Sequence, residues 1–338
     1  MAQPAGSRRR RIFRGGSDIN PSWHYWMIYL LPGILIYIFF MAWPLIDSIR
    51  VSFYQTNDGI RQFVGFSNYI TLFTDPILKE RFWGAFRHTW IFFAIHMCVQ
   101  NVLGMLFATI LTNKTMRGVR GYQTILFLPV TLSILVTGYL WKLLLNPVWT
   151  GSVFEKMGLG FLSQPYLGME NIALPVISLV SCWQWVGIPT MMFFAALQGI
   201  SEEVIEAASL EGCSGWQMFR FIQLPLIMPI VGIIAILTFV NNFNAFDVIY
   251  AMEGPNGPPN YSTDIIGTFF YRLGIAGEHP VAIPNPGLGA TLATVIFIML
   301  TIFVVPTHGA AVSGRDRYRR RAGHDQDADQ RAHHQPNH

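Results

Sequence analysis

The sequence has 338 residues, of which 52% are hydrophobic and only 12% are charged, and its mean hydropathy is +0.37. Soluble globular domains carry about 25% charged residues, so a chain of this length has too few charges to cover the surface of a soluble protein. This composition excludes a wholly disordered chain, a collagen-like repeat and a disulfide-stapled secreted domain, and it favours a polytopic membrane protein.

Six stretches of at least 18 residues contain no Asp, Glu, Lys or Arg. About 20 apolar residues, each rising about 1.5 Å, cross the hydrocarbon core of a bilayer as a helix. The stretches are continuously apolar instead of alternating with polar residues, which indicates helices and not a barrel. The sequence therefore predicts an all-α fold with six transmembrane helices, near residues 26–46, 90–112, 122–144, 173–197, 224–250 and 287–307.

Lys and Arg are distributed unevenly between the predicted loops. If both termini lie in the cytoplasm, 15 of the 23 basic residues fall on the cytoplasmic side, where membrane proteins concentrate them. The sequence thus predicts a basic cytoplasmic segment at 1–22, a transmembrane domain at 23–310 and a disordered cytoplasmic tail at 311–338. The first apolar run is too long for a signal peptide and has no small-x-small cleavage site, so we interpret it as a retained helix.

The segment between the fourth and fifth predicted helices carries the sharpest local pattern. Ser201 is a candidate N-cap, and the acidic residues that follow it suit the positive end of a helix dipole. At about 100° per residue, Val204, Ile205 and Ala208 form one apolar strip, and Gly212 supplies a turn after the helix. These residues alone leave two interpretations open: an interfacial loop helix, or a helix whose small residues let another protein approach closely.

This segment resembles the EAA loop of membrane subunits in binding-protein-dependent ABC importers, with the matching positions Glu206, Ala207, Ala208, Gly212, Ile222, Leu224 and Pro225. Residues 63–69 (FVGFSNY) resemble an outer segment of the same family. Residues 243–250 and the outer loop after them are similar to carbohydrate-uptake permeases of the maltose-importer type. The resemblance covers roughly residues 25–307 and implies a type I ABC importer permease architecture.

The resemblance implies a transport subunit with no catalytic residues, no metal and no cofactor of its own. Such a subunit moves a sugar, polyol or oligosaccharide, delivered by an extracytoplasmic solute-binding protein, across the bacterial inner membrane. The implied partners are ABC ATPase subunits that bind ATP and Mg, a second homologous permease and membrane lipid, but no nucleic acid. The chain contains no G-x-x-x-x-G-K-[ST] phosphate loop, so its energy must come from a partner. The EAA loop at 201–225 would dock on the ATPase and switch the access of the cavity.

The fifth predicted helix interleaves amides with aromatic rings at membrane depth, where unpartnered polar groups are costly. Amides hydrogen-bond sugar hydroxyls and aromatic faces stack on sugar C–H surfaces, which predicts a substrate pathway at Asn241, Asn242, Asn244, Phe243 and Phe246. Asn241 and Asn244 share one helical face and the two phenylalanines lie well round from it. All five can line one axis only if the helix unwinds there. The alternative is that the asparagines hydrogen-bond neighbouring helices.

Other polar residues have less specific interpretations. Residues 183–185 (WQW) either line the pathway or lie at the membrane interface. His96 is predicted to be a packing histidine with satisfied nitrogens, and the three cysteines predict neither a disulfide framework nor a metal site. Asp247 either caps an outer gate or pairs with Arg272.

A stand-alone secondary transporter or a polytopic membrane enzyme is the alternative function. Either class should place clustered acids or histidines inside its helices. The predicted helix cores hold almost no acid apart from Asp247, which argues against both classes. The sequence leaves open which sugar is carried, and how substrate contacts are shared with a partner permease.

Overall fold

The computed structural model describes residues 23–57, 60–113, 115–160 and 163–304. The predicted basic segment at 1–22, the predicted tail at 311–338 and the end of the sixth predicted span lie outside these residues. The chain divides into two compact units, Met1–Ser48 and Ile49–His338, and each is described by itself.

The first unit holds the first predicted span. Helix α1 (Trp23–Tyr37) continues through one π-helical turn, η1 (Ile38–Ala42), into α2 (Trp43–Val51). The apolar side chains from Met27 to Ile46 are largely exposed, as expected of a helix whose neighbours are lipid. Met27–Val51 is long and apolar enough to cross a bilayer, which agrees with the predicted span at 26–46.

The second unit begins with a short antiparallel hairpin, β1 (Tyr54–Asn57) and β2 (Ile60–Phe63), followed by α3 (Ser67–Thr74). A 36-residue helix then runs from Pro76 to Leu111 as α4 (Pro76–Ile95), the π-helical η2 (His96–Gln100) and α5 (Asn101–Leu111). Asp75 caps it, because its carboxylate accepts the backbone N–H of Leu78 at 2.9 Å. The helix begins well before residue 90, the predicted start, because its first turns carry charges that the search for charge-free runs excluded.

The third and fourth predicted spans are each bent. Helix α6 (Val119–Phe127) and η3 (Leu128–Thr131) meet α7 (Ile134–Leu144) at 94°, and α9 (Ala173–Trp185) meets α10 (Gly187–Gln198) at 47°. A proline lies three residues from each break, Pro129 before the first and Pro189 after the second, and a proline has no N–H to continue the helical ladder. The described residues contain four helices long enough to span a membrane, or six if each bent pair is one span.

The fifth predicted helix is continuous at its start and broken near its end. The π-helical η6 (Met218–Gln223) leads directly into α12 (Leu224–Phe243), so this helix begins before residue 224, the predicted start of the span. Helical structure stops at Asn244 and resumes in α13 (Asp247–Glu253), so the predicted single helix at 224–250 unwinds at residues 244–246. The backbone of Gly267 packs against this break, and a Cβ there would come within 2.1 Å of the carbonyl oxygen of Ala245.

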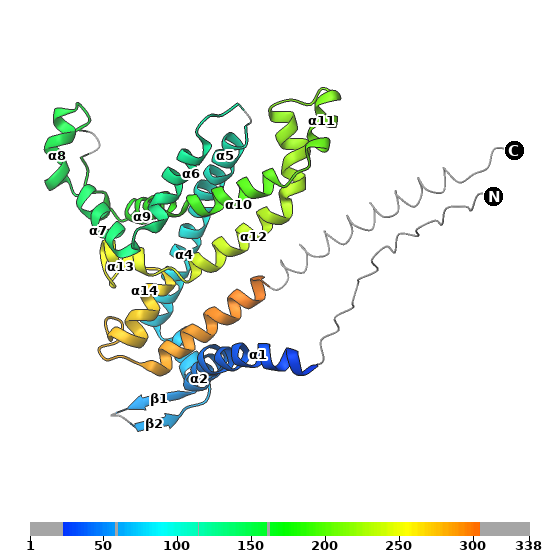
Figure 1. Cartoon of the computed structure of the whole chain (residues 1–338). Coiled ribbons are helices and arrows are strands. Elements are labelled where there is room, and N and C mark those ends of the chain that lie inside the picture. The colour runs from blue at the N-terminus through cyan, green and yellow to red at the C-terminus, as the bar shows by residue number, and fades with distance from the viewer. Residues whose placement is uncertain (1–22, 58–59, 114, 161–162, 305–338) are drawn as a thin grey trace, which may run out of the picture. The chain divides into compact units, whose positions relative to one another are not determined.

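The remaining elements connect these helices. Helix α8 (Pro147–Lys156) and the turn η5 (Tyr166–Gly168) precede α9, and α11 (Glu202–Leu210) joins α10 to η6. Helix α14 (Ile266–Tyr271) and η7 (Arg272–Ala276) precede the last described helix, Pro286–Val304. Within the second unit, Figure 1 shows α11 at the opposite end of the helical assembly from α14 and the β1–β2 hairpin.

Three apolar clusters form the core of the second unit. One gathers Phe239 and Phe243 of α12 with side chains of α4, α14 and the last helix. A second joins α9 to α13 around Ile177 and Ile249, and a third joins α5, α10 and α12 around Phe193. Buried polar side chains also occur between these helices, and a few of them line one cavity.

Candidate functional site

A cavity of about 380 Å³ lies beside the break between α12 and α13. Its walls come from α4, η2, α7, α9, α10, α12 and α13, and its lining includes four of the five predicted pathway residues, Asn241, Asn242, Asn244 and Phe246. The break brings these four together, because residues 244–246 leave the helical repeat and no longer point round the helix axis.

The three asparagines are held in different ways. Asn242 is buried, and its Nδ2 donates to the carbonyl oxygen of Thr238 at 2.6 Å. Asn244 donates in the same way to the carbonyl oxygen of Val240 at 3.0 Å, while Asn241 is exposed. These bonds stay within α12. The hydrogen bond between helices is made instead by Asn101 of α5, whose Nδ2 donates to the hydroxyl of Thr238 at 3.0 Å.

The two predicted phenylalanines have different surroundings. Phe243 is buried in the aromatic core, with its ring centre 4.5 Å from that of Phe239 and 5.4 Å from that of Trp90. It lines a second cavity, of about 460 Å³, and not the one that the asparagines share. Phe246 lines both cavities and lies 5.0 Å from the ring of Tyr250. An aromatic face beside the asparagines is therefore supplied by Phe246.

Sequence reasoning missed a polar group that η2 and α9 contribute to the same cavity. Gln100, His96 and Ser181 all line it, and all three are buried. His96 lies 2.8 Å by Nδ1 from the carbonyl oxygen of Phe92 and 3.0 Å by Nε2 from the hydroxyl of Ser181, so its nitrogens are satisfied as predicted. The available signal was the spacing of His96 and Gln100, four residues apart on one face of an apolar helix.

The three residues of the WQW segment of α9 have different surroundings. Trp185 lines the cavity, whereas Trp183 is exposed and its ring centre lies 5.4 Å from that of Trp141. Gln184 is fully buried, and its Nε2 donates to the carbonyl oxygen of Leu132 at 3.1 Å. This bond holds α9 against the extended residues at the bend between η3 and α7.

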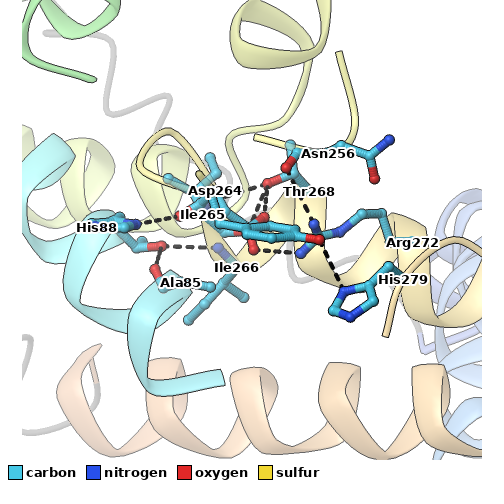
Figure 2. Close-up of polar contacts among 11 residues, drawn as sticks. Ala85, His88, Asn256, Asp264, Ile265, Ile266, Thr268, Arg272 and His279 are labelled. Atoms are coloured by element: carbon cyan, nitrogen blue, oxygen red, sulfur yellow. Dashed lines mark hydrogen bonds and ion pairs between the residues drawn. The ribbon is translucent and has the colours of Figure 1, made fainter. Parts of the chain in front are cut away.

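A buried ion pair joins the loop after α13 to α14 (Figure 2). The guanidinium of Arg272 contacts the carboxylate of Asp264, which also accepts the hydroxyl hydrogen bond of Thr268 at 2.7 Å. The sequence offered Asp247 as a partner for Arg272, and the structure corrects this, because Arg272 is fully buried beside Asp264 while Asp247 lines the cavity. Burial raises the pKa of the Asp264 carboxyl to about 6, and the nearby Arg272 acts in the opposite direction.

The same network fastens this loop to α4. His88 lies with its Nδ1 2.9 Å from the carbonyl oxygen of Asp264, and the hydroxyl of Thr89 accepts the backbone N–H of Ile266 at 3.0 Å (Figure 2). Nearby, the guanidinium of Arg81 lies 3.7 Å from the ring centre of Tyr261. The loop is thus a fixed part of the fold at the end of the second unit that lies away from α11.

The EAA segment forms an exposed helix with a tight exit. Ser201 stands at the N-cap position of α11 with extended backbone, although its hydroxyl makes no capping bond. Gly212 has a φ of +90°, and the backbone N–H of Cys213 donates to the carbonyl oxygen of Ala208 at 3.0 Å, so the predicted glycine turn is present. Helix α11 packs against η6.

The seven EAA positions differ in exposure. Glu206, Ala207, Gly212 and Pro225 are exposed, and Ile222 and Leu224 are half-buried. Only Ala208 of the set is buried. Leu210 beside them is 90% exposed, which leaves an apolar side chain with nothing of this chain's described residues to cover it.

Comparison with known proteins distinguishes an ABC importer permease subunit from the two alternative classes, a secondary transporter and a membrane enzyme. The family described as "Binding-protein-dependent transport system inner membrane component" matches residues 100–315, which include α11 and most of the cavity lining. The chain belongs to this family. It is a multi-pass membrane protein and an ABC importer permease subunit of the sugar-uptake type. It is a transport component and not an enzyme, and ATP hydrolysis belongs to partner ATPases.

Several relatives are named as permease proteins of transport systems. The lactose transport system permease protein LacF of Rhizobium radiobacter is 27% identical, over 89% of this chain and 96% of that protein. The multiple sugar-binding transport system permease protein MsmF of Streptococcus mutans is 30% identical, over 85% and 94%. The sn-glycerol-3-phosphate transport system permease protein UgpA of Escherichia coli is 29% identical, over 87% and 96%.

Solved structures share the fold. A chain of a bacterial ABC transporter involved in import of the acidic polysaccharide alginate superposes with a TM-score of 0.73 at 22% identity, covering 88% of this chain and 97% of that one. The same kind of transporter, in complex with an alginate pentasaccharide-bound periplasmic protein, gives a TM-score of 0.70. The chain therefore shares the fold of these transporter chains.

Proposed function

We propose that this subunit carries a sugar, polyol or oligosaccharide through the cavity beside the α12–α13 break. The observation that supports this most directly is the gathering of Asn241, Asn242, Asn244 and Phe246 around one cavity. Polar side chains at membrane depth are costly and mark substrate paths. Amides beside one aromatic face match the alternating hydroxyl and C–H surfaces of a sugar ring.

We propose further that α11 is the coupling helix through which partner ATPases act. Its exposed Glu206 and Ala207, and the apolar Leu210, form a surface that only another protein would cover in the cytoplasm. The other proposed partners are a second homologous permease and an extracytoplasmic solute-binding protein. ATP and Mg bind to the ATPases and not to this chain.

The proposed topology has six spans, each bent pair counted as one, in the bacterial inner membrane with both termini in the cytoplasm. A reporter active only in the cytoplasm should be active after Gly212 and silent after Thr74, Lys156 or Asn260. Cytoplasmic activity at Asn260 would contradict the topology, because the Asp264–Arg272 network would then lie on the same side as α11.

A cysteine scan across residues 238–247 tests the pathway. Single cysteines at Asn241, Asn244 and Asp247 line the cavity and should be protected from a thiol reagent by transported sugar. A cysteine at Val240, which is not part of the lining, is the matched control and should react equally with and without sugar. Protection at Val240 with none at the asparagines would make the asparagines packing residues.

The coupling proposal is tested at Gly212 and Glu206. Gly212→Leu places a side chain at a φ of +90°, which strains the turn although no neighbour lies within 4 Å. Glu206→Lys reverses a charge on the exposed face. Both variants should insert in the membrane yet lose ATPase association and uptake, whereas Gly199→Ala, at a φ of −75°, should retain both. Normal transport in both variants would contradict the proposal that α11 is the coupling helix.

A further inference from the structure

A polar contact between Asn101 and Thr238 joins α5 to α12. Residues 224–237 of α12 carry no polar side chain, so Thr238, four residues before Asn242, is the first in this helix. Its hydroxyl accepts a hydrogen bond from Nδ2 of Asn101 at 3.0 Å, and both side chains are buried. Within the part of the chain that the structure describes, this is the only pair of residues whose side-chain hydrogen bond links α12 to another helix.

The surroundings of the hydroxyl set the direction of this bond. Oγ1 of Thr238 lies 2.8 Å from the carbonyl oxygen of Ile234 and 3.4 Å from Oδ1 of Asn101, so the closer carbonyl takes the hydroxyl proton. The hydroxyl oxygen is then free to accept from the amide of Asn101, whose other neighbour is the weakly accepting Sδ of Met97 at 3.2 Å. Because the hydrocarbon core holds no water to replace a lost partner, this bond favours one placement of α12 beside α5.

Helix α5 also holds a second wall of the cavity, although it does not line the cavity itself. It packs closely against α10, since a Cβ at Gly104 would lie 3.2 Å from the side chain of Pro189. Helix α10 contributes Pro189 and Met192 to the lining, and α12 contributes Thr238 and Asn242. One helix outside the cavity therefore fixes two of its walls, α10 by close packing and α12 by the amide of Asn101.

The contact reaches the proposed substrate path through one turn of α12. The carbonyl oxygen of Thr238 accepts the Nδ2 hydrogen of Asn242 at 2.6 Å, and both residues line the cavity. A shift of Thr238 relative to α5 would therefore carry the Asn242 amide with it. Hydrogen bonds between membrane helices change an equilibrium by about threefold on average and by up to about 18-fold, so the loss of one bond is enough to populate displaced positions of α12.

We infer that Asn101 is a positioning residue for the transport cavity. It acts through Thr238 and keeps α12 at the spacing from α10 that ligand binding requires, without touching the ligand. The inference rests on the proposed transport of sugars through this cavity. Since only the correctly placed fraction of molecules binds, loss of the bond should weaken the apparent affinity in proportion to that fraction and spare the rate at saturation.

The first measurement is the distance between α5 and α12 in the assembled transporter, with its ATPases and second permease, by electron paramagnetic resonance. Spin labels are attached at Leu106 and Ile233, which are exposed and line no part of the cavity, after the three native cysteines are replaced by alanine. Asn101→Leu removes the amide at similar volume and should broaden or shift the distance distribution. Thr190→Val is the matched control, because this buried hydroxyl donates within α10 to Val186, and it should leave the distribution unchanged.

The second measurement separates affinity from turnover in ATP-driven uptake by proteoliposomes supplied with the solute-binding protein. Lactose, maltotriose and raffinose are the probes. Asn101→Leu should raise the KM of a transported probe by about 3- to 18-fold and leave kcat unchanged, and Thr238→Val should do the same. The double variant should be no worse than either single variant, because both changes remove one bond. Thr190→Val should keep the KM of the wild type.

The possible results separate the inference from the function beneath it. If a probe is transported and Asn101→Leu leaves its KM unchanged, or lowers kcat instead, the positioning role is overturned and sugar transport stays in place. An unchanged distance distribution overturns it equally, and so do additive effects of the two substitutions, because Asn101 would not then act through Thr238. Failure of the wild type to transport any probe would overturn the proposed function, and the inference with it.

Discussion

Replacing either member of the Asp264–Arg272 pair should destabilise the protein, but only the loss of Arg272 should make its stability depend strongly on pH. Both side chains are buried, so the change Asp264→Asn leaves a guanidinium with no carboxylate. Breaking a buried ion pair in this way costs about 3–5 kcal/mol. Because Arg keeps its proton at every accessible pH, acidification brings no relief.

Arg272→Met leaves a buried carboxyl that can escape its charge by taking up a proton. The pKa of Asp264 is already raised to about 6 with Arg272 present, so it lies higher once the guanidinium is gone. The folded state then binds a proton that the unfolded state releases near its ordinary pKa of about 3.9, so stability rises as pH falls through the folded pKa. Between pH 7.5 and 5.5 the gain is up to about 3 kcal/mol, against a smaller gain for the wild type and none from this group in Asp264→Asn.

The measurement is the melting temperature of the purified transporter at both pH values. The expected order at pH 7.5 places both single variants below the double variant Asp264→Asn/Arg272→Met, which buries no unpaired charge. Asp247→Asn is the control, since Asp247 is exposed and its loss should change stability by about 0.5 kcal/mol or less. Equal melting temperatures for Arg272→Met at the two pH values, after subtraction of the Asp264→Asn response, would refute the reasoning.

Two contrasts of substitutions test the packing around the break. Gly267→Ala should lower the melting temperature sharply, since its Cβ would meet the carbonyl oxygen of Ala245 at 2.1 Å, whereas Gly232→Ala, with nothing within 4 Å, should raise stability by up to about 1 kcal/mol through helix propensity. Phe239→Ala, at a site 2% exposed, should cost about 3–5 kcal/mol, whereas Phe246→Ala, at a half-buried site, should cost less yet change the range of sugars bound. If the two variants of either pair lost the same amount of stability, the difference in packing described for the two positions would be contradicted.

The lipid environment explains why so much of the fold is predictable from the sequence. Charges are excluded from the hydrocarbon core, so charge-free runs mark the spans regardless of tertiary contacts. The turn after the EAA helix could likewise be predicted from the sequence, because its positive φ favours a glycine. The start of α4 was misplaced because its outer turns carry charges such as Lys79 and Arg81 yet remain helical.

The site could be predicted only in part, because tertiary packing decides its geometry. The bends in the third and fourth spans were not predicted, and residues 244–246 (NAF), where α12 breaks, contain neither glycine nor proline. The break there depends on the Asn244 amide bonding back to Val240, and on the close approach of Gly267 from α14. Gln100 was missed for the same reason, since only the assembled bundle shows that its oxygen has no partner.

The position of the break gives the proposed coupling a mechanical route. Helices η6 and α12 form one uninterrupted rod of 26 residues, about 39 Å long, with α11 packed at its start and Asn242 near its end. Helix α13, beyond the break, belongs to a different apolar cluster, shared with α9. A displacement of α11 would therefore be carried along α12 to one wall of the cavity, while α13 stays with the other wall. An unbroken helix would move both walls together, so the same unwinding that gathers the asparagines also allows the cavity to change shape.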